Sequence, residues 1–382
     1  MSTSDAIYLD HAATSPLRRP VLDAMMPYLT EHFGNPSSVY ASGREARHTL
    51  EKCRARVAEL IGAGSAEVFF TSGGSESNNT AIRSAFREGR PLLTSAAEHE
   101  AVLEPVGSLD EGTTITPDLN GCVSGSMLEA HEIRGGAVSM MLVNNELGSI
   151  NPIHELANYC HDNDVLIHTD AVQAARVLDL RSIIPSVDYL SLSGHKLGGP
   201  KGVGLLYVRA GAPFKPLILG GGQEQERRAG TENVASIVGF TTALEYAVDQ
   251  RAQFVEHCRG LKTALIDGLR ADLGDLVQVN SPEEDSSPHI VNLLLLDDNG
   301  SGLDGEMLLL GLDIEGVYVS AGSACSSGTV KSSHVLKAIQ IPGHKAKGAI
   351  RISFGPESSV DEVREAVRRI LLVSKRMRSG QI

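Results

Sequence analysis

No part of this 382-residue sequence is apolar over a length that would span a membrane, and no internal repeat or low-complexity segment is visible. The N-terminus, Met1 to Asp5, lacks the basic region followed by an apolar region that marks an exported protein. We therefore expect a cytoplasmic protein with no membrane partner.

Basic residues are also fewer than acidic ones: the sequence has 34 Lys and Arg and 47 Asp and Glu, which gives a net charge of −13. A protein that binds nucleic acid through its phosphates usually carries a basic patch. We expect no direct nucleic-acid binding, and we interpret the acidity as a contribution to solubility.

The five cysteines are widely separated and include no Cys-x-x-Cys pair. Neither a disulfide framework nor a closed zinc site is supported, and we expect reduced thiols and no metal. Four of them are expected to pack as small hydrophobic side chains: Cys53, Cys122, Cys160 and Cys258. Cys325 differs, because small residues surround it from Ser320 to Ser333, which predicts a mobile, solvent-accessible loop.

Short apolar runs alternate with helical or loop segments, which is typical of an α/β protein with a mainly parallel, doubly wound sheet. The predicted strands are 67–71, 91–95, 137–143, 165–169, 187–192 and 203–208, and a helix is predicted over 76–86. After about Gly239 a long charged helix is predicted over 241–273, then a strand over 290–296. A final helix begins at the capping box Ser359 to Glu362. The length favours a large domain and a smaller one.

Three features fall at the predicted ends of strands. Lys196 lies in a glycine-rich turn, Asp170 ends an apolar run, and Thr71 to Ser77 links a strand to a helix. A lysine for an aldehyde, an acid for a pyridinium nitrogen and donors for a phosphate are what pyridoxal phosphate (PLP) requires. Each feature has a simpler interpretation: a surface lysine, a helix cap and a polar connection. Their shared order and placement favour PLP.

Short motifs are spread along the chain: YLDHAAT (8–14), FGNPSS (33–38), TSGGSES (71–77), EH (98–99), VNNE (143–146), HTDAVQ (168–173), SGHK (193–196), GGGQE (220–224), RAGTEN (228–233) and SAGSACSS (320–327). In these motifs and their order, the sequence resembles the cysteine desulfurases of the NifS and IscS type, in the class V aminotransferase superfamily. The resemblance covers nearly the whole chain.

This resemblance implies the PLP-dependent fold type I. Its large domain, residues 16–245, would hold a mainly parallel seven-stranded sheet. Its smaller α+β domain would combine residues 1–15 with 246–382 and carry the mobile catalytic-cysteine loop at about 321–334.

The resemblance also implies roles for cofactor-binding residues. Lys196 would carry PLP as a Schiff base, Asp170 would pair with the pyridinium nitrogen, and His99 would stack on the ring. Four further residues would hold the phosphate: Gly74, Ser75, Ser193 and His195.

Thr231 would join these phosphate ligands from the other subunit of a homodimer. Asn145 and Gln173 would reach the phenolic oxygen of the cofactor or the substrate. Arg351 would bind the substrate carboxylate as a bidentate fork, although a structural ion pair is its alternative.

The implied activity is conversion of L-cysteine to L-alanine, with sulfur passed as a persulfide on Cys325 to an acceptor protein. Iron–sulfur cluster assembly, tRNA thiolation and DNA phosphorothioation all use such persulfides, and the sequence selects none of them. Two other functions remain open. One is a selenocysteine lyase or a lyase that releases sulfide without Cys325, and the other is a non-catalytic sulfur carrier.

Overall fold

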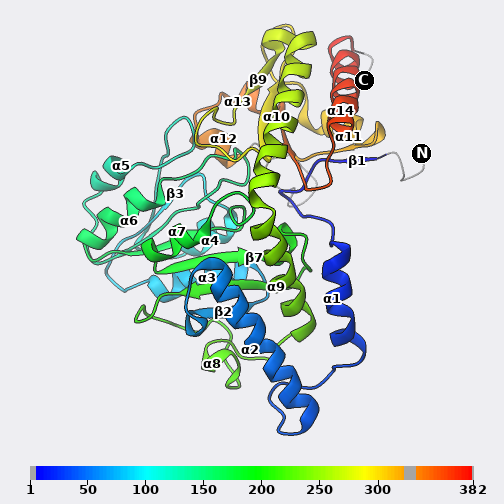
Figure 1. The fold of residues 1–382 in the computed structure, drawn as a ribbon. Coiled ribbons are helices and arrows are strands. Elements are labelled where there is room, and N and C mark those ends of the chain that lie inside the picture. The colour runs from blue at the N-terminus through cyan, green and yellow to red at the C-terminus, as the bar shows by residue number, and fades with distance from the viewer. Residues whose placement is uncertain (1–5, 322–332, 381–382) are drawn as a thin grey trace.

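A seven-stranded sheet with helices on both faces forms the largest part of the protein (Figure 1), in a computed structural model that describes residues 6–321 and 333–380. In spatial order its strands are β2 (Val68–Thr71), β8 (Gly204–Val208), β7 (Tyr189–Ser193), β6 (Leu166–Asp170), β5 (Ala137–Ser139), β3 (Leu92–Ser95) and β4 (Gly112–Ile115). The strands β7, β6, β5, β3 and β4 run parallel, and β8 is antiparallel to both of its neighbours. The predicted α/β fold with a mainly parallel seven-stranded sheet is confirmed.

Adjacent residues of these strands face opposite sides of the sheet and enter different buried clusters. Phe69 and Leu206 pack with the helices α3 (Gly74–Ala85) and α4 (Glu100–Gly107), whereas Phe70 and Leu205 pack in the larger cluster on the other face. Apolar side chains are therefore needed at successive positions, which explains why the strands appear in the sequence as continuous apolar runs.

The described residues form helices of very different length. Their bounds are α1 (Arg19–Thr30), α2 (Ala41–Ile61), α3 (Gly74–Ala85), α4 (Glu100–Gly107), α5 (Gly125–Glu129), α6 (Ile153–Asp162), α7 (Leu180–Ile183), α8 (Gln223–Glu226), α9 (Val234–Asp249), α10 (Arg251–Leu273), α11 (Gly305–Ile314), α12 (His334–Ala338), α13 (Gly343–Ala346) and α14 (Val360–Arg378). Among the described residues, none of these helices is both long and apolar enough to cross a membrane.

Two smaller sheets lie beyond the seven-stranded one. The strands β12 (Ala349–Ser353), β10 (Ile290–Leu295) and β9 (Val277–Val279) form an antiparallel sheet, and β1 (Ile7–Tyr8) pairs in parallel with β11 (Val317–Tyr318). The helices α10, α11 and α14 lie near them at one end of the molecule (Figure 1). The start of the chain is thus built into the region formed by its last third.

Two predicted elements differ clearly from the structure, and the strands β1, β4, β9, β11 and β12 were not predicted. The helix predicted over 241–273 is two helices, because the backbone leaves the helical conformation at Gln250. The strand predicted over 137–143 ends at Ser139, and farther along the chain Asn144 Oδ1 accepts from the Glu146 and Leu147 amides and closes a turn. The short strand β4 was missed, because its central residues are exposed and give no apolar signal.

The predicted capping box of α14 is confirmed. Ser359 Oγ accepts a hydrogen bond from the Glu362 amide at 3.2 Å, and the Ser359 amide donates to Glu362 Oε2 at 2.8 Å. Two backbone amides at the helix N-terminus are satisfied in this way.

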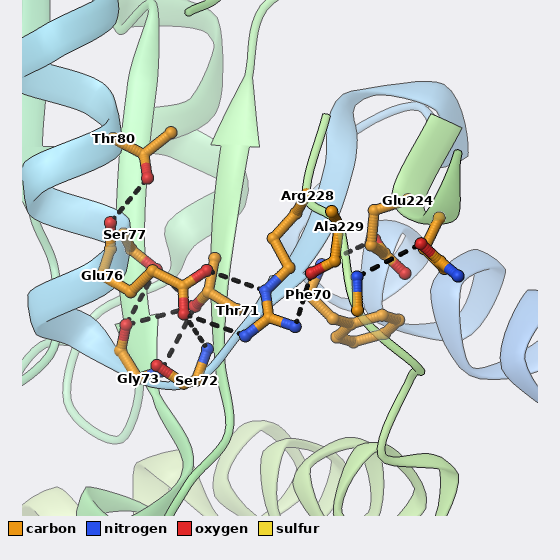
Figure 2. A network of polar contacts seen from close by, with 12 residues as sticks. Phe70, Thr71, Ser72, Gly73, Glu76, Ser77, Thr80, Glu224, Arg228 and Ala229 are labelled. Carbon is orange, nitrogen blue, oxygen red and sulfur yellow. Dashed lines mark hydrogen bonds and ion pairs between the residues drawn. The ribbon is translucent and has the colours of Figure 1, made fainter. Parts of the chain in front are cut away.

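A buried ion pair between Arg54 and Glu224 connects α2 with α8 beside the edge strand β2. The two contacts measure 2.7 and 2.8 Å, and each side chain is only 2 % exposed. Glu224 Oε2 also accepts from the Phe70 amide at 2.9 Å (Figure 2). Glu224 itself has a left-handed φ of 46°, so these bonds hold a backbone conformation that is costly for glutamate.

We predict that Arg54→Met lowers the free energy of unfolding by about 3–5 kcal/mol, because it leaves the Glu224 carboxylate buried without its counter-charge. Urea denaturation at fixed protein concentration measures this change. The matched control is Arg56→Met, since Arg56 is more exposed and pairs with Glu59 and Glu245; we expect a loss below about 1 kcal/mol there. Equal losses in the two variants would contradict the prediction.

Candidate active site

A cavity of about 320 Å³ opens where β6 and β7 end. Asp170 is the last residue of β6 and Ser193 is the last residue of β7, and both side chains are buried. Ligands of open α/β sheets bind at these carboxyl ends. The lining includes most of the residues predicted from the sequence: Gly74, Ser75, His99, Asn145, Asp170, Gln173, Ser193, His195, Lys196 and Arg351.

Lys196 lies in the short 3-10 helix η4 (Gly194–Lys196) that follows β7. Its Nζ donates to Ala12 O at 2.6 Å and to Ala13 O at 2.7 Å. Burial, together with the positive charge of Arg351, lowers the pKa of Lys196 to about 8. A large fraction of the side chain is therefore a neutral, nucleophilic amine in mildly alkaline solution.

Asp170 is held rigidly by two hydrogen bonds. Its Oδ2 accepts from Asn78 Nδ2 of α3 at 2.6 Å, and its Oδ1 accepts from the Val172 amide at 2.9 Å. The second bond is the local turn bond that the simpler interpretation of Asp170 predicts. The carboxylate nevertheless lines the same cavity as Lys196, so it is available to a ligand there.

The N-terminus of α3 forms one end of the cavity. A Cβ on Gly74 would lie 2.9 Å from Val172 Cγ2, so only glycine fits there comfortably. The first amides of a helix have no partner within the helix, and they favour an anion. Burial and the charges of two lysines lower the pKa of His195 to about 4, so this neighbour of the helix end is neutral at pH 7.

His99 is the N-cap residue of α4. Its Nδ1 accepts from the Ala101 amide at 3.0 Å, which fixes the orientation of the ring in the cavity wall. Burial is the main cause that lowers the pKa of His99. A neutral imidazole held in this way can lie against an aromatic ligand.

Arg351 of β12 is buried on the opposite wall. Its Nη2 donates to Asp10 Oδ1 at 2.9 Å, and its Nη1 donates to Asn145 O at 2.9 Å. The structural ion pair considered as an alternative for Arg351 is therefore present, yet the same guanidinium lines the cavity. The Asn145 side-chain oxygen is buried and has no hydrogen-bond partner among the described residues.

Thr231 does not reach this cavity within one chain. It lines a separate pocket of about 220 Å³ together with Thr71, Ser72 and Arg228. Arg228 Nε donates to Glu76 Oε1 at 3.0 Å, so the segment before Thr231 is fixed to the start of α3 (Figure 2). The connection between β2 and α3 therefore lies between the two pockets, with Ser72 on one side and Gly74 on the other.

Comparison with known proteins agrees with this geometry, since the model of the class-V aminotransferase family matches residues 7–365. The chain belongs to this family. It is 44 % identical over 359 residues to the cysteine desulfurase IscS of Dictyoglomus turgidum, which covers 91 % of this chain and 89 % of that protein.

Two solved structures are also similar to this chain. One, titled NifS-like protein, superposes with a TM-score of 0.88 at 33 % identity and covers 97 % of this chain and 99 % of that one. The other is SspA in complex with cysteine, with a TM-score of 0.77, 33 % identity and coverage of 92 % and 99 %. The resemblance stated from the sequence motifs is confirmed.

Sequence reasoning assigned no role to several residues at this class-V aminotransferase site. Asp10 and Glu98 lie inside matching segments, which is the signal that could have found them. Glu98 is fully buried, and burial raises its pKa well above the usual range. Asn78 gave no signal, because it is a polar residue within a helix. His334 stands at the end of the segment 321–334, which was singled out for Cys325 alone; its Nε2 donates to Glu98 O at 2.8 Å.

The cysteines within the described residues are thiols in this structure. Cys53, Cys160 and Cys258 are buried as predicted, while Cys122 is half-buried and donates to Ile150 O at 3.5 Å. Burial raises the pKa of Cys122, Cys160 and Cys258 to about 12, so none of these three is a ready nucleophile. Cys325 lies outside the described residues.

We predict that the apoprotein attaches PLP covalently at a rate that rises with pH and has a midpoint near 8. The physical reason is that only the neutral amine attacks the aldehyde, and the lowered pKa of Lys196 sets its fraction. Stopped-flow absorbance between about pH 6.5 and 10 measures the rate. Lys196→Ala is the control and should show no covalent attachment. A midpoint above about 10, the value of an ordinary lysine, would contradict the prediction.

Proposed function

We propose that this protein is a PLP-dependent cysteine desulfurase, which converts L-cysteine to L-alanine and passes the sulfur through a persulfide on Cys325. The observation that carries the proposal is one cavity lined by Lys196, Asp170 and Arg351, which offers an amine, a carboxylate and a guanidinium. Similarity to the IscS cysteine desulfurase of Dictyoglomus turgidum and to SspA, whose structure contains cysteine, supports the reaction and the substrate.

The cavity fits PLP. Gly74, at the N-terminus of α3, has no side chain to obstruct a phosphate, and the first amides of the helix can donate to it. Ser193 and His195 line the same cavity. The Asn145 side-chain oxygen has no hydrogen-bond partner in the described part of the chain, so it offers a polar contact to a ring substituent. Gln173 lines the same cavity. His99 would lie against the ring, with Asp170 at its nitrogen.

PLP, when bound, withdraws electrons from the substrate Cα and so makes its hydrogen acidic. Asp170 would hold a proton on the ring nitrogen, since its carboxylate is fixed by Asn78 and the Val172 amide. Lys196 Nζ would take the Cα proton, because its lowered pKa suits a base that works near neutral pH. Arg351 would hold the substrate carboxylate as a bidentate fork, since a guanidinium matches the geometry of a carboxylate.

The sulfur step needs a thiolate. Cys325 Sγ would attack the substrate sulfur, forming an S–S bond as the bond between that sulfur and Cβ breaks. The electron pair of the broken bond stays on Cβ, which takes up a proton and becomes the methyl group of alanine. The transferred sulfur is oxidised and the carbon is reduced, so no external oxidant is required. An acceptor protein of an iron–sulfur assembly or thiolation system would then remove the sulfur.

Thr231 supports a homodimeric enzyme. Its pocket lies across the β2–α3 connection from the Lys196 cavity, so within one chain it cannot serve as a phosphate ligand there. We propose that it completes the phosphate site of the partner subunit.

Cys325→Ser is expected to keep cofactor and cysteine binding but to lose persulfide and nearly all alanine formation, because a hydroxyl is not ionised near neutral pH. Cofactor absorbance reports binding, and mass spectrometry and amino-acid analysis report the products. Cys122→Ser is the matched control, since Cys122 is half-buried and has a raised pKa; it should behave as wild type. Alanine production by Cys325→Ser at the wild-type rate would favour a lyase that releases sulfide. Failure of the wild-type protein to bind PLP would favour a sulfur carrier.

A second prediction tests the contribution of Thr231 across subunits. Thr231→Ala alone should weaken PLP binding by about tenfold, the value of one hydrogen bond to a charged group. Mixing and re-pairing these chains with Lys196→Ala chains should restore wild-type PLP affinity in about a quarter of the sites, because half of the dimers contain one intact site. Fluorescence titration measures the affinity. No recovery on mixing would show that Thr231 acts within its own chain or not at all.

A further inference from the structure

A second cavity, of about 190 Å³, lies at the junction of α9 and α10 and shares no lining residue with the cavity at Lys196. Two arginines from distant parts of the chain line it, Arg18 before α1 and Arg176 after β6. Aromatic rings of Tyr246 and Phe254 form part of its wall, together with Gln250.

Arg176 is an unusual residue for a protein interior. It is 7 % exposed, and within residues 6–321 and 333–380 it makes no hydrogen bond or ion pair; its Nε is fully buried and unsatisfied. Its guanidinium carbon lies 5.6 Å from the centroid of the Phe254 ring. Burial and the charge of Arg18 lower the pKa of Arg176 to about 10, so it still carries its proton at pH 7. A buried cation without a partner is strongly unfavourable.

Arg18 increases the positive charge of the same cavity. Both of its terminal nitrogens donate to the neutral Gln250 Oε1, at 3.3 and 3.2 Å, and its guanidinium carbon lies 4.7 Å from the Tyr246 ring centroid. The two arginines flank Gly198, where a Cβ would lie 2.8 Å from Arg18 Cγ and 3.2 Å from Arg176 Nη2.

Only one carboxylate is placed to compensate this charge among the described residues near the cavity. Glu357 lies 4.0 Å from Arg18 Nε and is 69 % exposed, so it is solvated and at the limit of an ion pair. It makes no ion pair with Arg176. The cavity therefore offers two guanidinium groups beside the rings of Tyr246 and Phe254, and the described residues supply no hydrogen-bond acceptor to the Arg176 guanidinium.

We propose that this cavity binds a small oxyanion, a phosphate or carboxylate group on a compact apolar body, with Arg176 as its buried ligand and Arg18 as its outer ligand. Guanidinium groups bind both oxyanions in bidentate geometry. Tyr246 and Phe254 would contact the apolar part. The proposal does not depend on the reaction at Lys196.

Phenyl phosphate and benzoate are suitable probes, because they share the ring and differ in the charged group. Benzyl alcohol carries the ring without the charge. Each is titrated by calorimetry into the PLP-loaded protein at constant ionic strength. We expect one of the two anions, and not the alcohol, to bind and to raise the melting temperature. The anion with the higher affinity identifies the preferred oxyanion.

Arg176→Met should reduce the affinity at least tenfold while the protein without anion melts no lower than wild type, since a buried unpaired charge has been removed. Arg176→Lys keeps a cation and should retain part of the binding. Arg19→Met is the matched control, because Arg19 is 82 % exposed and pairs with Asp23; it should bind as wild type does.

Three results would overturn the proposal. The first is no anion binding by wild type, and the second is the same anion affinity in wild type and Arg176→Met. The third is a large loss of anion-free stability in both Arg176→Met and Glu357→Gln, which would identify Glu357 as the permanent counter-ion of Arg176.

Discussion

The site depends on the hydrogen bonds made by the short segment from Leu9 to Thr14. This segment lies between the end of β7 and the buried strand β12. Lys196 Nζ and Gln173 Nε2 both donate to Ala12 O, at 2.6 and 2.9 Å. On the other side, the Ala12 amide donates to Ser353 Oγ at 2.8 Å and Asp10 holds Arg351. Lys196 and Arg351 therefore reach one cavity through a segment that belongs to neither strand.

Burial sets the chemistry of this cavity as much as the identity of its residues. It lowers the pKa of Lys196 to about 8 and that of His195 to about 4, so an amine and an imidazole that would be charged or half-charged in water can act in neutral form. Arg351 is buried and has Asp10 as its ion-pair partner at 2.9 Å. The anion proposed for the second cavity follows the same principle: Arg176 is buried to a similar degree and lacks the companion that Arg351 has.

Much of the fold could be predicted because its strands are covered on both faces. Paired apolar neighbours such as Phe69 and Phe70 mark such strands in the sequence, whereas the exposed edge strand β4 left no pattern. The break between α9 and α10 was also missed, because no residue in the sequence marks it. Gln250 is compatible with a helix, and its departure from one is decided by the surrounding packing.

The sequence by itself determined which residues stand at strand ends, and hence that Lys196, Asp170 and Ser193 share one edge of the sheet. Local periodicity suffices for this, since parallel strands place their carboxyl ends together. Only the tertiary structure decided that Asp10 pairs with Arg351, 341 positions away, that Asn78 holds Asp170, and that Arg18 and Arg176 meet at one cavity. Such contacts depend on how distant segments pack and on the solvent they exclude, and no spacing along the chain encodes them.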